Sequence, residues 1–191
     1  MLGGTGIDHL YGEDGDDILS GDAGVAGLTE TINGGNGSDT ARYEFSDAAV
    51  TIDLAAAGGP TASGGHADGD VLISIENLFG SAFADTLTGD SGDNTLRGDG
   101  GGDILDGAGG TNDTASYQNS ADAVTVKLTN GAASGVDAAG GDAAGDTLTG
   151  IENLIGSDNT TTGDTLTGDV NNNIIEGGAG GDNIDGGGGT N

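Results

Sequence analysis

The 191-residue sequence contains no cysteine, so disulfide bonds and thiolate metal sites are excluded. It has one proline, three tyrosines, three phenylalanines and no tryptophan, and no apolar run approaches the roughly 20 residues of a membrane span. Only three residues are basic whereas 32 are acidic, which gives a formal net charge of −29. Such a charge repels phosphate, so we expect no nucleic-acid partner and no binding to anionic membranes.

What the chain has in abundance is glycine, at 43 positions. Many like charges combined with few bulky side chains are typical of a disordered chain, because too little apolar surface is available for burial. The sequence therefore predicts that the metal-free chain is marginally stable or unfolded. A divalent cation that neutralised pairs of carboxylates would favour the folded state.

A nine-residue unit, G-G-x-G-x-D-x-U-x with U a large aliphatic residue, recurs through most of the chain, and it is intact at residues 3–11 and 177–185. Its first six residues form a glycine-rich turn that ends in a carboxylate, and its last three form a short strand that buries one side chain. Such a turn offers backbone carbonyls and an aspartate to a hard cation. The pattern therefore indicates that the chain binds several Ca²⁺ ions.

The units form three blocks, at residues 3–42, 80–116 and 156–191, and two copies of a longer segment, at 43–79 and 117–155, lie between them. We call these two copies the long segments. The first contains one lengthened and one shortened unit that contribute Asp70 and Glu76, so we expect one continuous solenoid over residues 1–191. The predicted metal ligands are the acids at the sixth position of the units and their counterparts in the long segments: Asp8, Asp17, Glu30, Asp39, Asp70, Asp85, Asp103, Asp113, Asp146, Asp164 and Asp182.

A three-residue strand followed by a six-residue turn reverses the chain, so two units close one coil and residues 18 apart become vertical neighbours. We therefore expect an all-β parallel β-roll in which the acids stack. The pairs that we expect are Asp17 with Asp39, Asp85 with Asp103, Asp164 with Asp182, Asp8 with Glu30, and Asn94 with Asp113. Two carboxylates and several turn carbonyls suit Ca²⁺ and fit Mg²⁺ poorly.

This arrangement resembles the RTX (repeats-in-toxin, haemolysin-type) calcium-binding β-roll over nearly the whole chain. The resemblance implies a right-handed parallel β-roll, type I secretion and folding in millimolar external calcium. It also implies that the aspartate side chains and the turn carbonyls are the ligands. Asn94 and Asn173 replace the acid, Phe83 replaces a turn glycine, and Glu30 is a longer side chain, so we expect weaker sites there.

No H-E-x-x-H or G-x-S-x-G motif is present. We therefore expect a non-catalytic, extracellular structural module that acts as a scaffold or spacer in a secreted bacterial protein. Residues 186–191 resemble the opening of another repeat, so we expect the remainder of a larger secreted polypeptide as its covalent partner. The alternatives are the repeat portion of a secreted protease, lipase or polysaccharide-modifying enzyme, or of an adhesin.

Overall fold

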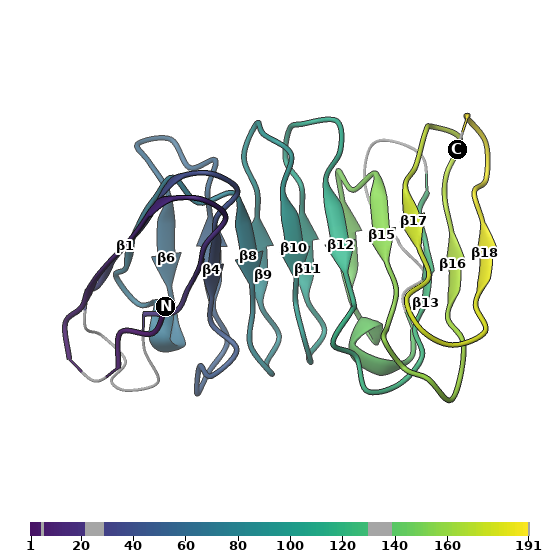
Figure 1. Cartoon of the computed structure of the whole chain (residues 1–191), viewed down its shortest axis with the longest axis horizontal. Helices are drawn as coiled ribbons and strands as arrows, with labels where there is room; N and C mark the ends of the chain where they lie inside the picture. The colour runs from purple at the N-terminus through teal and green to yellow at the C-terminus, as the bar shows by residue number, and fades with distance from the viewer. Residues whose placement is uncertain (5, 22–28, 130–138, 191) are drawn as a thin grey trace.

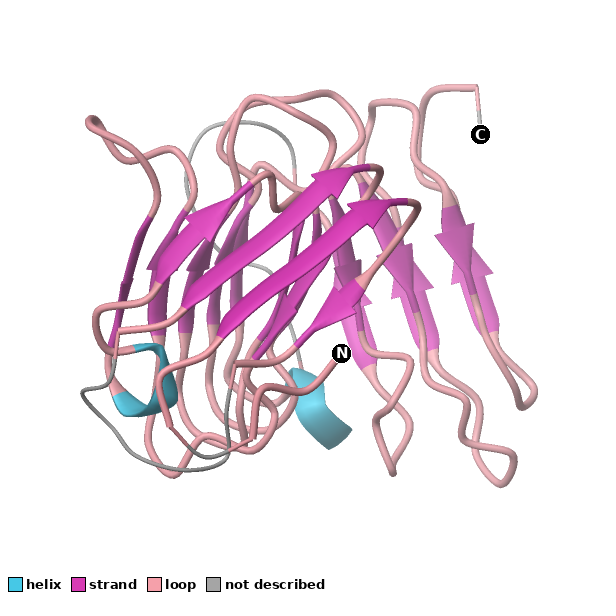
Figure 2. Cartoon of the chain, turned by 60° about the vertical axis from the view of Figure 1, so that its left-hand side comes forward, coloured by secondary structure: helices cyan, strands magenta, loops and turns pink. Residues whose placement is uncertain are grey.

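Short parallel strands stack into two facing layers of an elongated β-roll (Figure 1). The computed structural model describes residues 1–4, 6–21, 29–129 and 139–190. The strands are short because a glycine-rich turn begins again after about every three extended residues. Two single-turn 3₁₀ helices, η1 (Gly65–Ala67) and η2 (Gly141–Ala143), occupy equivalent places in the two long segments (Figure 2). The predicted fold class, an all-β parallel roll of nonapeptide repeats, is confirmed.

One layer, which we call the long face, is a single parallel sheet that runs along the roll. Its strands, in spatial order, are β2 (Ile18–Leu19), β4 (Thr40–Arg42), β8 (Asn77–Phe79), β10 (Thr95–Arg97), β12 (Thr114–Ser116), β15 (Asn153–Ile155) and β17 (Ile175–Glu176). Strand β8 from the first long segment pairs with β4 and β10, and β15 from the second pairs with β12 and β17. Both long segments therefore supply strands to the same sheet as the nonapeptide blocks.

The other layer, which we call the segmented face, is divided into three sheets. The first sheet contains β1 (His9–Asp14), β3 (Thr31–Asn36) and β7 (Val71–Ile73). The second contains β6 (Thr61–Ser63), β5 (Thr51–Asp53), β9 (Thr86–Thr88), β11 (Ile104–Asp106) and β14 (Thr147–Thr149). The third contains β13 (Thr125–Lys127), β16 (Thr165–Thr167) and β18 (Asn183–Asp185).

The breaks in the segmented face come from the long segments. Strand β5 precedes β7 in the sequence but lies farther along the roll, where it pairs in parallel with β9. Strand β6 then pairs with β5 in the antiparallel direction. The second long segment repeats this arrangement with an isolated antiparallel bridge between Thr125 and Ala139. The sequence did not predict these antiparallel contacts, because the repeat pattern describes only the parallel stacking.

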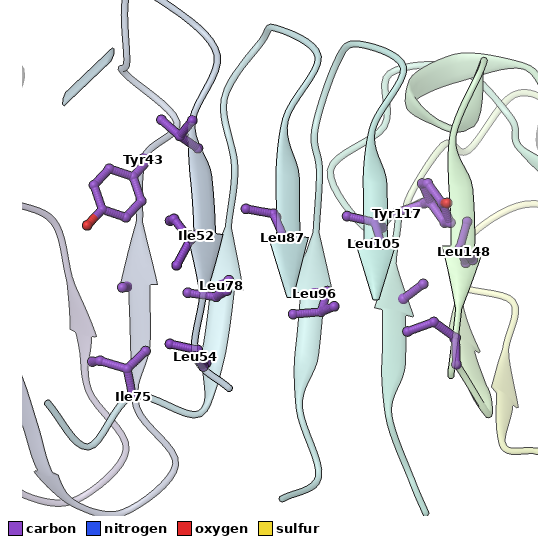
Figure 3. Close-up of a cluster of buried hydrophobic side chains, with 14 of the residues drawn as sticks. Tyr43, Ile52, Leu54, Ile75, Leu78, Leu87, Leu96, Leu105, Tyr117 and Leu148 are labelled. Atoms are coloured by element: carbon purple, nitrogen blue, oxygen red, sulfur yellow. The ribbon is translucent and has the colours of Figure 1, made fainter. Parts of the chain in front are cut away.

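A single row of aliphatic side chains from each layer fills the narrow core (Figure 3). Leu87, Leu96 and Leu105 from the second block are fully buried, and Leu78 and Leu154 from the long segments are fully buried in the same cluster. Ile184 is 47% exposed because β18 is the last strand of its sheet. The predicted strand positions thus form the core, except at this end of the roll. Among the described residues, no helix is long and apolar enough to cross a membrane.

Candidate metal-binding turns

The sixth-position residues of successive coils stack in ladders, which we call the acidic columns. The backbone N–H of Asp17 donates to Asp39 Oδ1 at 2.8 Å, and the N–H of Asp85 donates to Asp103 Oδ1, 18 residues later, at 2.8 Å. The same contact joins Asp164 to Asp182 at 2.9 Å and Asn94 to Asp113 at 2.8 Å. The strand register also places Asp8 beside Glu30. The five predicted neighbour pairs are therefore confirmed as neighbours.

The columns continue through the long segments. The N–H of Glu30 donates to Asp70 Oδ1 at 3.0 Å, and the N–H of Asp103 donates to Asp146 Oδ1 at 2.8 Å. On the other side of the roll, the N–H of Asp39 donates to Glu76 at 2.8 Å, and that of Asp113 donates to Glu152 at 3.0 Å. Glu152 is not among the residues predicted from the sequence, although the Ile-Glu-Asn-Leu run that contains Glu76 recurs at residues 151–154.

The second carboxylate oxygen distinguishes the columns' members from one another. Within the described part of the chain, the Oδ2 atoms of Asp8, Asp17, Asp39 and Asp103 are buried and accept no hydrogen bond. A buried charged oxygen without a donor is costly, because it has lost its water and gained nothing in return. These four aspartates therefore present an oxygen that a bound cation would satisfy.

A backbone carbonyl approaches the same space in three of these turns. A Cβ added to Gly12 would lie 2.4 Å from the carbonyl oxygen of Gly34 and 2.6 Å from Asp17 Oδ2. A Cβ at Gly34 would lie 2.2 Å from the carbonyl oxygen of Ser74 and 2.4 Å from Asp39 Oδ2, and Gly3 has a similar environment beside Asp8. The first glycine of the unit is thus required because a carboxylate and a carbonyl from the next coil converge there. Carboxylate and carbonyl oxygens are the donor set of Ca²⁺.

The columns concentrate negative charge at buried carboxylates. Burial raises the pKa of Asp103 to about 7 against the opposing hydrogen bond from the Asp85 N–H, and the Asp146 carboxylate adds to the rise. Burial likewise raises the pKa of Asp113 to about 6. Among the described residues, no group of three or more His, Cys, Asp or Glu side chains is arranged to hold a metal ion. The oxygens that converge with the carboxylates of Asp8, Asp17 and Asp39 are backbone carbonyls.

In the long segments, a tyrosine contacts the column carboxylate. The Tyr43 hydroxyl donates to Asp70 Oδ2 at 3.1 Å, and the Tyr117 hydroxyl donates to Asp146 Oδ2 at 3.0 Å. Burial and the adjacent carboxylate raise the pKa of both tyrosines well above its ordinary value, so both remain protonated donors. The sequence analysis missed these contacts; the signal was the recurrence of Ala-x-Tyr at residues 41–43 and 115–117.

Asp85 and Asp164 differ again, because a serine follows the first glycine of their turns. The backbone N–H of Ser81 donates to Asp85 Oδ2 and its hydroxyl donates to Oδ1 at 2.9 Å. Ser157 makes the same two contacts with Asp164, the hydroxyl bond being 2.8 Å. A Cβ at Gly80 would still lie 2.4 Å from Asp85 Oδ2 and 2.8 Å from the Gly98 carbonyl oxygen. These two turns therefore keep the converging oxygens but already contain donors.

The two asparagines in the columns make hydrogen bonds through both polar atoms of their amides. Asn94 Oδ1 accepts from the Asp90 N–H at 2.8 Å, and its Nδ2 donates to the Glu76 carbonyl at 2.7 Å. Asn173 does the same with Asp169 and Glu152. Because each amide is uncharged and its oxygen already accepts a hydrogen bond, the weaker sites that we expect at Asn94 and Asn173 stay a prediction.

A comparison with family models finds the RTX calcium-binding nonapeptide repeat, in four copies, at residues 1–25, 79–113 and 158–191. The chain carries the RTX calcium-binding repeat. The three RTX matches fall on the nonapeptide blocks. They include Asp8, Asp17 and Asp103, whose Oδ2 atoms have no donor among the described residues, whereas Asp39 lies in the first block but outside the match. Most of each long segment lies outside them. No curated protein matches the chain.

Proposed function

We propose that this RTX module is a structural, non-catalytic part of a larger secreted protein, that it folds when it meets extracellular Ca²⁺, and that it serves as a scaffold or spacer. The observation that carries the proposal is the set of buried Oδ2 atoms on Asp8, Asp17, Asp39 and Asp103, which have no donor within the described residues. Their burial beside other acids makes the metal-free fold costly. Calcium-coupled folding would leave the chain unfolded until it reached the extracellular medium.

The residues that would hold the ions are the column acids of the nonapeptide turns. Asp8, Asp17, Asp39 and Asp103 would each offer Oδ2. The Oδ1 atoms of Asp39 and Asp103 accept an N–H from the coil before them. Glu30, Asp113 and Asp182 stand in equivalent column positions, and Asp85 and Asp164 would bind less strongly because Ser81 and Ser157 already donate to them. A bound Ca²⁺ supplies positive charge and accepts several oxygens at once.

Folding of the 191-residue chain can be followed by far-ultraviolet circular dichroism during a calcium titration. We expect a change from coil to β signal in millimolar Ca²⁺, reversed by a chelator. Mg²⁺ at the same concentration should produce much less β signal, because it gives up its water ligands reluctantly and demands octahedral geometry. A complete β signal in excess chelator would contradict the proposal.

A matched pair of variants separates ligation from a general reduction in charge. Asp39→Asn and Asp68→Asn each remove one negative charge, but Asp39 is fully buried in a column whereas Asp68 is exposed. Asp39→Asn should raise the calcium concentration at the folding midpoint, and Asp68→Asn should leave it nearly unchanged. Equal shifts in the two variants would show that overall charge, and not a site at Asp39, governs the response.

A further inference from the structure

Asp70 occupies an acidic column, but its surroundings differ from those of Asp8, Asp17, Asp39 and Asp103, whose turns we call the calcium turns. Its Oδ1 accepts the Glu30 N–H at 3.0 Å and its Oδ2 accepts the Tyr43 hydroxyl at 3.1 Å. Both residues of the tyrosine–aspartate contact are buried, at 3% exposure for Tyr43 and 4% for Asp70. Each oxygen of this carboxylate therefore has a protein donor, in contrast to Asp39 and Asp103, whose Oδ2 atoms have none among the described residues.

The second long segment repeats this arrangement. Asp146 Oδ1 accepts the Asp103 N–H at 2.8 Å, and its Oδ2 accepts the Tyr117 hydroxyl at 3.0 Å. Tyr117 and Asp146 are buried to the same degree as their counterparts in the first copy. Much of the intervening sequence differs between the two copies, so the shared contact reflects the role of the tyrosine in the fold.

The glycine turns before Asp70 and Asp146 also differ from the calcium turns. A Cβ added to Gly69 would lie 3.0 Å from Thr29 Oγ1, and one added to Gly145 would lie 3.4 Å from Gly102 Cα. At Gly64 and Gly140 the nearest atoms are the carbonyl oxygens of Ala49 and Ala123. Among the atoms that a Cβ at these four described glycines would meet first, no carboxylate oxygen is present, whereas at Gly12 and Gly34 a carboxylate and a carbonyl meet.

We infer that Tyr43 and Tyr117 take the place of a calcium ion at Asp70 and Asp146, so that the two turns that carry these acids hold no metal within a roll that binds calcium elsewhere. This inference rests on the proposed function, and it removes two acids from the ligand set that the sequence predicts. The phenol hydrogen satisfies the oxygen that an ion would otherwise satisfy, and both tyrosine rings lie in the same buried core cluster as Ile52 and Leu148 (Figure 3).

The number of ions bound per chain tests this assignment directly. Equilibrium dialysis of the full chain against Ca²⁺, followed by elemental analysis, should give the same count for wild type, Asp70→Asn and Asp146→Asn. Asp39→Asn and Asp103→Asn should each lose at least one ion. All four changes are nearly isosteric and remove one charge, and circular dichroism in calcium establishes that each variant is folded.

Loss of an ion in folded Asp70→Asn or Asp146→Asn would overturn the inference and leave the proposed function intact. A wild-type chain that bound no calcium would overturn the proposed function, and the inference with it. A second experiment compares Tyr43→Phe with Tyr11→Phe in calcium, since Tyr11 is 55% exposed. Tyr43→Phe should lower Tm by several degrees with an unchanged ion count, and Tyr11→Phe should change neither. An unchanged Tm for Tyr43→Phe, or an altered ion count, would overturn the inference.

Discussion

The nonapeptide blocks and the long segments build the same roll but complete it differently. In the blocks, carboxylates such as Asp17 and Asp39 keep a buried oxygen that no described donor reaches, beside a carbonyl of the next coil. In the long segments, Asp70 and Asp146 continue the columns of Asp8 and Asp103, and Tyr43 and Tyr117 donate to them. The comparison leads us to propose that a column position alone does not make a metal ligand. In this proposal, the groups that face the carboxylate determine whether its second oxygen is available to an ion.

The two regions nevertheless share one core, and this connects their stabilities. Leu78 and Leu154 from the long segments pack in the same cluster as Leu96 and Leu166 from the blocks. Their strands are also hydrogen-bonded to block strands on both sides in the long face. We therefore expect a destabilising substitution in a long segment to weaken calcium binding in the neighbouring nonapeptide block. Such a substitution tests the prediction that residues 1–191 form one continuous solenoid.

The largest expected effect is that of Leu154→Ala. Leu154 is fully buried in β15, so the change should lower the free energy of unfolding in calcium by about 2–5 kcal/mol through the cavity that it leaves. It should also weaken calcium binding at the adjacent third block. Denaturant titration measures the first effect, with Ile104→Ala, at an exposed strand position, as the control. A loss similar to that of the control would mean that the blocks fold independently of the long segments.

The next largest effect is expected for Gly177→Ala, with Gly181→Ala in the same repeat as the control. A Cβ at Gly177 would lie 2.4 Å from Asp182 Oδ2, whereas a Cβ at Gly181 would meet nothing within 4 Å. Gly177→Ala should therefore cost about 1–3 kcal/mol through overpacking and should weaken calcium binding. Gly181→Ala should be close to neutral in the same thermal and calcium titrations. Equal costs would show that the space beside the carboxylate is not what requires glycine.

A smaller effect is expected at the turns that have an internal donor. Ser157→Ala removes the hydroxyl that donates to Asp164 Oδ1 but keeps the backbone N–H, so its cost should be about 0.5–1.5 kcal/mol. Ser91→Ala, at an exposed turn position, should have no measurable effect in the same denaturant titration. If Ser157→Ala were equally silent, the hydroxyl would contribute nothing to stability, and the backbone donors to Asp164 would suffice.

The smallest expected effect is a pH dependence of the metal-free chain. The folded-state pKa values of Asp103 and Asp113 are raised to about 7 and about 6 from an ordinary value of 3.8, so the fold binds protons that the unfolded chain does not. The metal-free fold should therefore gain stability as pH falls from 7 toward 4 and lose it as pH rises through these values. With metal removed, the β signal should be larger at pH 5 than at pH 8, and less so in Asp103→Asn. A smaller signal at pH 5 would contradict this.

Much of the fold could be predicted from the sequence, because period-nine glycine turns leave the chain few ways to stack. Counting 18 residues per coil, and allowing for insertions, placed Asp17 on Asp39 and Asp85 on Asp103 correctly. The antiparallel pairing of β6 could not be predicted, since the first long segment runs forward along the roll and then returns, and no repeat period describes that path.

The hydrogen-bond partners of the column acids could be predicted only in part, for a different physical reason. The pattern identifies where a carboxylate stands, but its second oxygen is satisfied or not by groups distant in sequence. Tyr43 and Asp70 are 27 residues apart, and only the folded path brings them together. The serine beside Asp85 is local, yet its double contact depends on the turn geometry that the G-G pattern leaves open.

The most direct measurement is a crystal structure of the chain grown with Ca²⁺, with the ions located by anomalous scattering after exchange for a lanthanide. We expect ions in the turns beside Asp17, Asp39 and Asp103, and none between Tyr43 and Asp70 or between Tyr117 and Asp146. The absence of ions beside those three aspartates, or an ion at either tyrosine–aspartate contact, would contradict this expectation.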